Sequence, residues 1–203
     1  MSLHILIPAA GASSRMRGTD KLAEEVDGQP LLRRCCEMAL EVSPEVTVAL
    51  PANGSPFAAT RNAALEGLPL RLRRYAASAD GLGGTISAAI ADLEPGPSHL
   101  MILLPDLVGL TAPDLVQVFD PEDDTIRRGT AQDGRPGHPV VIPAWLFAAF
   151  ANADVGDAGP RAVLKAHGVT PVALPGDRAV LDLDTPEDWA DWRAGRRPTA
   201  SSS

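Results

Sequence analysis

The chain has few cysteines, few aromatic residues and no excess of positive charge. Its two cysteines, Cys35 and Cys36, are adjacent, so they cannot form an ordinary disulfide with each other and lack the spacing of metal ligands. The formal net charge is −8, from 18 Lys and Arg against 26 Asp and Glu. Because no general basic field attracts phosphates, this composition argues against a nucleic-acid binder or a protein of anionic membranes.

Long hydrophobic runs are also missing. No apolar stretch reaches the roughly 18 residues that a membrane span needs, and the first residues lack the pattern of a secretory signal. We therefore expect a cytoplasmic protein with no membrane or nucleic-acid partner. The 203 residues, 45% of them apolar, fit one domain. We expect this domain over residues 1–195 and a disordered tail over residues 196–203.

A short apolar strand followed by a loop of small residues is the most informative stretch. Residues 4–7 predict a buried strand that ends at Pro8, and two cations, Arg15 and Lys21, close the loop. Small residues let the backbone approach a ligand, and successive N–H groups can surround an anion. Arginine adds a planar fork for phosphate oxygens and lysine a mobile charge. The stretch therefore predicts a nucleotide-phosphate site.

Two common phosphate loops are absent. No Gly-Lys-Ser or Gly-Lys-Thr follows Gly11, so the loop is not a P-loop. No Gly-x-Gly-x-x-Gly series occurs in it, which excludes the dinucleotide fingerprint.

Three later segments carry further candidates. A glycine loop, Asp80 to Ser87, leads into a predicted helix, whose first turn presents free N–H groups. The apolar run 99–104 predicts a buried strand that ends at Asp106, where open α/β sheets place ligands and where a carboxylate can hold Mg²⁺. Asp182 and Asp184 follow a predicted strand at 179–183, and alternation places both on one face.

The order of elements predicts the fold class. Helices are expected at 30–40, 56–65, 88–93, 112–119, 143–150, 156–166 and from Thr185, and strands between them at 45–50, 70–75, 99–104, 125–131 and 169–174. We interpret Cys35 and Cys36 as core residues of the first helix. Strands that alternate with helices indicate an α/β domain with a mostly parallel sheet.

In their order, these segments resemble the nucleotidyltransferases that have a MobA-like NTP-transferase domain. The matching residues are Ala9-Ala10-Gly11, Ser13, Arg15-Met16 and Lys21, then Gly81 and Thr85, Asp106, Gly137-His138-Pro139-Val140, Gly156-Asp157 with Gly159 and Arg161, and Asp182 to Asp188. Arg17 is an extra residue before Gly18 and moves Lys21 by one position. The resemblance implies a single-domain, Rossmann-like, GT-A-like three-layer sandwich.

The resemblance also implies the roles of residues. It makes Arg15, Lys21 and Asp106 catalytic, and it assigns His138 and Arg161 to the acceptor. It implies Mg²⁺ on Asp106 and on Asp184, with Asp182 as the alternative second ligand. The nucleotide-binding set is Ala9, Ala10, Gly11, Ser13, Ser14, Arg15, Lys21, Asp80, Gly81 and Thr85.

The implied reaction transfers an NMP from an NTP to a phosphorylated acceptor and releases pyrophosphate. Ala10 and the Gly-His-Pro-Val segment are typical of the cytidylyl branch, which favours CTP and molybdopterin, with a molybdoenzyme or its chaperone as a partner. The alternatives are a sugar or alcohol phosphate as acceptor, or guanylyl transfer to molybdopterin. Leu107-Val108 replace the family's Gln-Pro or Met-Pro, which leaves a non-catalytic nucleotide-binding accessory protein as an alternative of another class.

Overall fold

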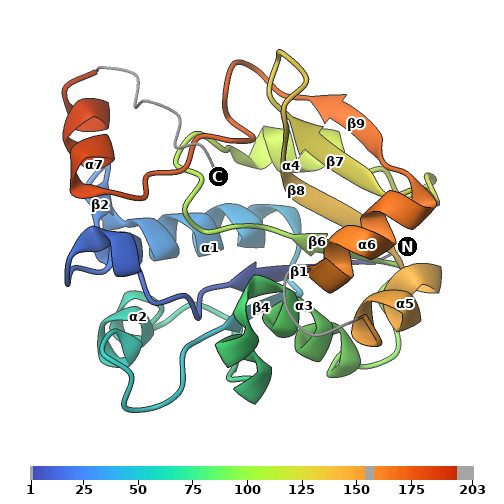
Figure 1. The fold of residues 1–203 in the computed structure, drawn as a ribbon, viewed down its shortest axis with the longest axis horizontal. Helices are drawn as coiled ribbons and strands as arrows, with labels where there is room; N and C mark the ends of the chain where they lie inside the picture. Colours follow the sequence, from blue (N-terminus) through green and yellow to red (C-terminus); the bar gives the residue numbers. More distant parts are fainter. Residues whose placement is uncertain (1, 154–157, 196–203) are drawn as a thin grey trace.

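A seven-stranded, mostly parallel sheet forms the centre of the computed structural model, which describes residues 2–153 and 158–195 (Figure 1). The strand order is β5-β4-β1-β6-β8-β7-β9. β8 runs antiparallel to both of its neighbours, and the other pairs are parallel. The strands are β1 (Leu3–Pro8), β4 (Val46–Ala49), β5 (Arg71–Arg73), β6 (His99–Ile102), β7 (Arg127–Thr130), β8 (Pro136–Pro143) and β9 (Thr170–Ala173). The predicted α/β class is confirmed.

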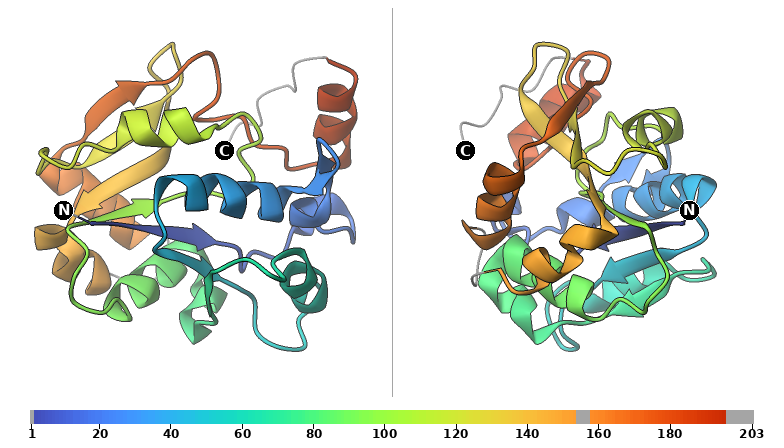
Figure 2. Two further views of the ribbon diagram at one scale, coloured as in Figure 1. Left: turned by 180° about the vertical axis from the view of Figure 1, so that it is seen from behind. Right: turned by 90° about the vertical axis from the view of Figure 1, so that its right-hand side faces the viewer.

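Helices cover both faces of the sheet and complete the three layers (Figure 2). The helices are α1 (Leu31–Val42), α2 (Ala58–Ala64), α3 (Gly81–Ala91), α4 (Ala112–Val118), α5 (Phe147–Ala151), α6 (Ala158–His167) and α7 (Pro186–Arg193); β2 (Glu25–Val26) and β3 (Gln29–Pro30) form a small separate ribbon. Side chains of β1 alternate between two cores. Ile5 and Ile7 pack with α1 and α4, whereas Leu6 packs with α3 and α5.

The apolar pattern of α1 explains its position. Leu32, Cys35, Cys36 and Ala39 recur every three or four residues and are buried against the sheet. Both cysteines are free, and burial raises the pKa of the Cys36 thiol to about 12. Their interpretation as core residues is confirmed.

Two predicted local structures are wrong. The glycine segment after Asp80 is not a loop, because α3 already begins at Gly81. A Cβ atom at Gly84 would collide with the carbonyl of Ala77, so this glycine lets the preceding 3₁₀ turn pack against the helix. The strand expected at 179–183 is absent: that segment is a turn with one isolated bridge, Leu107 to Asp182.

The last helix begins as the sequence predicts. The hydroxyl of Thr185 accepts a hydrogen bond from the Asp188 amide, and the Asp188 carboxylate accepts one from the Thr185 amide. Residues 196–203, and Gly156 and Asp157 of the matching segment before α6, lie outside the described residues. Among the residues described, no helix has the length and apolarity needed to cross a membrane.

Candidate active site

The loop after β1 adopts left-handed backbone angles at two residues that are not glycine. Ser13 has a φ of 48° and Arg17 a φ of 52°, values that cost energy for L-residues. Between them, one 3₁₀ turn buries Met16. Arg17 pairs on the surface with Glu187 at 2.8 Å. The extra residue of the motif is therefore accommodated at the surface, and Lys21 still points into the cleft.

A buried ion pair holds this loop from beneath. Arg61 on α2 is 1% exposed and donates to both carboxylate oxygens of Asp20, at 2.6 and 2.8 Å. Its Nη1 atom donates to the carbonyl oxygens of Ala9 and Gly11 at 2.7 and 2.8 Å. Asp20 also accepts a hydrogen bond from Ser13. Two carbonyl oxygens that would repel phosphates are thus bound by a guanidinium.

Arg61 is a site residue that the motif comparison misses. Ala58, Arg61 and Leu65 follow each other at intervals of three and four residues, and all three are buried. An arginine on the apolar face of a short helix is rarely buried without a partner carboxylate. The position of Arg61 on the apolar face of its helix is therefore the signal in the sequence that could have identified it as a site residue.

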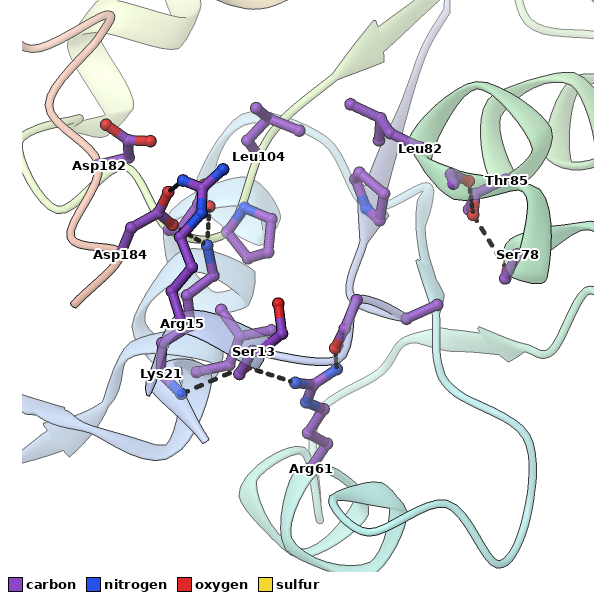
Figure 3. Close-up of a pocket in the computed structure, with 18 residues that line it drawn as sticks. Ser13, Arg15, Lys21, Arg61, Ser78, Leu82, Thr85, Leu104, Asp182 and Asp184 are labelled. Atoms are coloured by element: carbon purple, nitrogen blue, oxygen red, sulfur yellow. Dashed lines mark hydrogen bonds and ion pairs between the residues drawn. The ribbon is translucent and has the colours of Figure 1, made fainter. Parts of the chain in front are cut away.

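Lys21 joins two carboxylates from distant parts of the chain. Its Nζ atom donates to Oδ2 of Asp106 at 2.6 Å and to Oδ1 of Asp184 at 2.7 Å. Burial lowers the pKa of Lys21, but the two carboxylates raise it more, so its net pKa is raised. Figure 3 shows Arg15 bound to the same Asp184 from the rim of the cavity. The site is a compact cluster of two cations and two anions.

Asp182 lies beside this cluster but forms no hydrogen bond or ion pair with Lys21 or Arg15 in the described part of the chain (Figure 3). Burial raises its pKa, and the charges of Asp106 and Asp184 raise it further. Asp184 is therefore the carboxylate that shares Lys21 with Asp106, and Asp182 adds a third carboxyl group at the edge of the same cavity.

The donor set fits a divalent cation that also binds substrate phosphates. Oδ1 of Asp106 is buried and has no hydrogen-bond partner among the described residues. An unpartnered buried carboxylate oxygen is costly unless a ligand completes it. Within residues 2–153 and 158–195, no three His, Cys, Asp or Glu side chains converge as a closed metal cage. Mg²⁺ needs no such cage, because one or two carboxylates suffice when phosphates and water supply the rest.

The N-terminal end of α3 forms the opposite wall. Gly81, Leu82 and Thr85 line the cavity together with Ser78. The Thr85 hydroxyl donates to Ser78 at 3.0 Å or to the Gly81 carbonyl at 3.1 Å. Figure 3 shows Ser78, Leu82 and Thr85 across the cavity from Lys21 and Asp184.

The cavity between these walls has a volume of about 370 Å³. Most of the sequence-predicted nucleotide and metal residues line it: Ala10, Gly11, Ser13, Ser14, Arg15, Lys21, Gly81, Thr85, Asp106 and Asp184. Ala9 and Asp80 do not. Ala9 is fully buried below the loop, and Asp80 is exposed on the turn before α3. The roles of the lining residues stay predictions.

The two predicted acceptor residues, His138 and Arg161, lie in a second cavity. Burial and, to a smaller extent, the charge of Arg128 lower the pKa of His138. The charge of Asp106 partly opposes this shift, and the net pKa is about 4. The ring is thus neutral near pH 7, and its Nδ1 atom lies 3.4 Å from the carbonyl oxygen of Ile102.

Comparisons with known proteins agree with this fold. The MobA-like NTP transferase domain model matches residues 5–172. The chain belongs to that family, and it is a nucleotidyltransferase. It is 28% identical over 204 residues to the molybdenum cofactor guanylyltransferase of Cereibacter sphaeroides, with 94% of this chain and 95% of the relative covered.

Two solved structures share the fold. Rv0371c from Mycobacterium tuberculosis superposes with a TM-score of 0.77 at 23% identity, covering 96% of this chain and 97% of the other. A nucleotidyl transferase from Methanothermobacter gives a TM-score of 0.76 at 17% identity, with 96% and 97% covered. At these identities the likeness establishes the fold alone.

Proposed function

We propose that the protein transfers CMP from CTP to the phosphate of a molybdopterin-type acceptor and releases pyrophosphate. The observation that carries the proposal is the position of Lys21. Its ammonium lies between Asp106 and Asp184, on the wall of a cavity that the loop after β1 and the first turn of α3 complete. Cations, small residues and carboxylates meet at the carboxyl ends of β1 and β6, where open α/β sheets bind ligands.

The proposed chemistry depends on positioning and charge neutralisation. An acceptor phosphate oxygen attacks the α-phosphorus in line, a P–O bond forms, and the bond to the β-phosphate oxygen breaks to release pyrophosphate. The attacking oxygen is already anionic, so no general base is required. Lys21 and Arg15 stabilise charge on the transferred group and the leaving pyrophosphate. Loop amides held in place through Arg61 and Asp20 bind the remaining phosphate oxygens.

Asp106 and Asp184 are the residues that would hold Mg²⁺, which when bound neutralises charge on the phosphate oxygens. In the structure, Lys21 forms ion pairs with both of these partly buried carboxylates. Its ammonium therefore lies on the wall of the same cavity, where we expect the phosphate oxygens to bind.

Two features support CTP, and one observation favours GTP as a second candidate. Ala10 lines the cavity, and Gly137-His138-Pro139-Val140 is typical of cytidylyl-transferring relatives. The curated relative, however, is named as a guanylyltransferase. The experiment is pyrophosphate release with each of the four ribonucleoside triphosphates, Mg²⁺ and molybdopterin, with sugar phosphates as competing acceptors.

Fastest release with CTP and molybdopterin supports the proposal, and fastest release with GTP replaces CTP by the second candidate. A sugar phosphate that reacts faster than molybdopterin overturns the proposed acceptor. If the protein binds a nucleotide but releases no pyrophosphate with any nucleotide and acceptor, the proposed catalysis is wrong. That result would support the alternative of a non-catalytic nucleotide-binding accessory protein.

A further inference from the structure

A second cavity adjoins the nucleotide cavity, and Leu82 lines both. It has a volume of about 310 Å³ and lies between the sheet and the layer formed by α3, α5 and α6. Its walls are mainly apolar, with Ile86, Ile102, Val140 and Phe150 among them. The only polar side chains on this lining, within the described part of the chain, are Arg128, His138 and Arg161.

Two guanidinium groups face this cavity without a carboxylate partner among the described residues. Arg128 donates from Nε to the Gly137 carbonyl at 2.7 Å, and Arg161 has no hydrogen bond or ion pair within those residues. Most other described arginines pair with an acid: Arg127 with Asp123 and Arg178 with Asp114 are examples.

The pKa of Arg128 shows the cost of this arrangement. Burial lowers its pKa, and the nearby charge of Arg161 lowers it further. Two like charges beside an apolar wall repel each other unless an anion lies between them. In a chain of net charge −8, a place with two cations and no described acid is a candidate site for an anion.

The position of the cavity relates it to the reaction. Leu82 lines both cavities, so the second cavity meets the nucleotide cavity at the first turn of α3. The second cavity therefore opens beside the place where we propose that the triphosphate binds. Arg128 and Arg161 do not line the nucleotide cavity. The phosphate that attacks must reach the nucleotide cavity, so these arginines are free to bind another group.

We propose that this second cavity binds the body of the acceptor, and that Arg128 and Arg161 together hold an anionic group on it that is distinct from the attacking phosphate. The proposal rests on the proposed nucleotidyl transfer. It defines the acceptor class as a flat, largely apolar or heteroaromatic phosphate with a second negative charge at its far edge. Acceptors with a cationic body, such as phosphocholine, are rejected by the two guanidiniums.

The test is a binding measurement that needs no turnover. Pterin-6-carboxylate is a fluorescent flat ring with a carboxylate and no phosphate. We expect it to bind the whole protein, and we expect Arg161→Ala to weaken that binding by about tenfold to a hundredfold, as for loss of a hydrogen bond to a charged group. Unsubstituted pterin is expected to bind weakly and equally to both proteins, because it lacks the anion.

Variants separate recognition from folding. Arg161 is exposed and unbonded within the described chain, so Arg161→Ala is expected to fold normally. Arg128→Ala removes the contact with Gly137 as well, so Arg128→Lys, which keeps the charge, is its companion. Arg74→Ala is the matched control, because Arg74 contacts the side chain of Asn62 and no described carboxylate.

Turnover supplies the second readout. In the transfer assay, Arg161→Ala is expected to raise KM for the acceptor by a similar factor while KM for the NTP stays unchanged. Equal binding of pterin-6-carboxylate by the wild type, Arg128→Lys and Arg161→Ala overturns the anion site, even if nucleotidyl transfer is observed. Arginine-dependent binding without any transfer supports the anion site and overturns the proposed function instead.

Discussion

The Nζ atom of Lys21 lies 2.6 Å from Oδ2 of Asp106, although 85 positions separate the two residues in the chain. The pair connects the loop after β1 to the loop after β6, two neighbouring parallel strands. Because the carboxyl ends of parallel neighbours lie at one edge of the sheet, the fold itself brings this cation and this anion together. The account of phosphate binding depends on that contact.

Removing either partner is expected to abolish most of the activity. Lys21→Ala and Asp106→Asn should each lower kcat by about 10²–10³-fold, because each removes charge stabilisation that develops in the transition state. The measurement is steady-state pyrophosphate release from purified protein, with circular dichroism to verify folding.

Lys165 provides the matched control for Lys21. It is the other lysine of the chain and is exposed on α6. Lys165→Ala should retain the wild-type kcat. If Lys21→Ala or Asp106→Asn keeps near-normal turnover, the role assigned to that residue is wrong.

The Arg61–Asp20 pair is expected to stabilise the fold as well as the loop. Arg61→Ala leaves the Asp20 carboxylate buried without its cation, which should lower the free energy of unfolding by about 3–5 kcal/mol. The freed loop should also bind the triphosphate more weakly. Urea denaturation and nucleotide titration measure the two effects separately.

Arg71→Ala is the control for this effect. Arg71 pairs with Glu45 at 2.6 Å, but both side chains are nearly half exposed, at 47% and 45%. Such surface pairs contribute about 0–1 kcal/mol. Equal losses of stability in Arg61→Ala and Arg71→Ala would contradict the importance that we give to the buried pair.

The two acidic residues before α7 are expected to differ in importance. Asp184→Asn should lower kcat/KM at least about tenfold more than Asp182→Asn, because Asp184 accepts from Lys21 and Arg15. The same assay, repeated over a series of Mg²⁺ concentrations, should show a raised metal requirement for Asp184→Asn. A larger defect in Asp182→Asn reverses the assignment.

The lowered pKa of His138 predicts that the free energy of unfolding depends on pH. Burial first, and then the charge of Arg128, lowers its folded-state pKa from 6.5 to about 4. As the pH falls through this window, the unfolded chain takes up the proton first, so this contribution to stability is lost between pH 6.5 and about 4. His138→Asn should therefore lose less stability than the wild type between about pH 7 and pH 5.

Urea denaturation at these two pH values provides the measurement. His167→Asn is the control, since His167 is exposed on α6. An equal pH-dependent loss in the wild type and in His138→Asn would show that His138 is not protonated in this window on unfolding.

The sequence predicts the parts of the site that depend on chain order and local chemistry. The strand before Asp106, the loop of small residues and the Thr185–Asp188 cap are confirmed because apolar periodicity and capping are local signals. Placing Lys21 near Asp106 needs in addition only the parallel-sheet rule.

The features that the sequence analysis predicts wrongly or misses depend on contacts between distant parts of the chain. From the sequence, Gly84 is interpreted as a loop glycine, yet it lies inside α3. A glycine is needed there because the Ala77 carbonyl packs closely against it, and this contact cannot be seen in the sequence. Alternation around Asp182 predicts a strand, but the segment forms a turn whose one bridge is to Leu107, a contact across the chain that alternation does not show. Arg61 escapes the motif comparison because its partners are buried carbonyls and one carboxylate from another segment.

A crystal structure of the protein with CTP and Mg²⁺ tests the central claim most directly. The account predicts the triphosphate in the cavity of about 370 Å³, with Lys21 on its phosphate oxygens and the ion on Asp106 and Asp184. A triphosphate bound elsewhere, for example beside Arg71 and Arg73 at the edge of the sheet, with Lys21 still joined to both carboxylates, would contradict it.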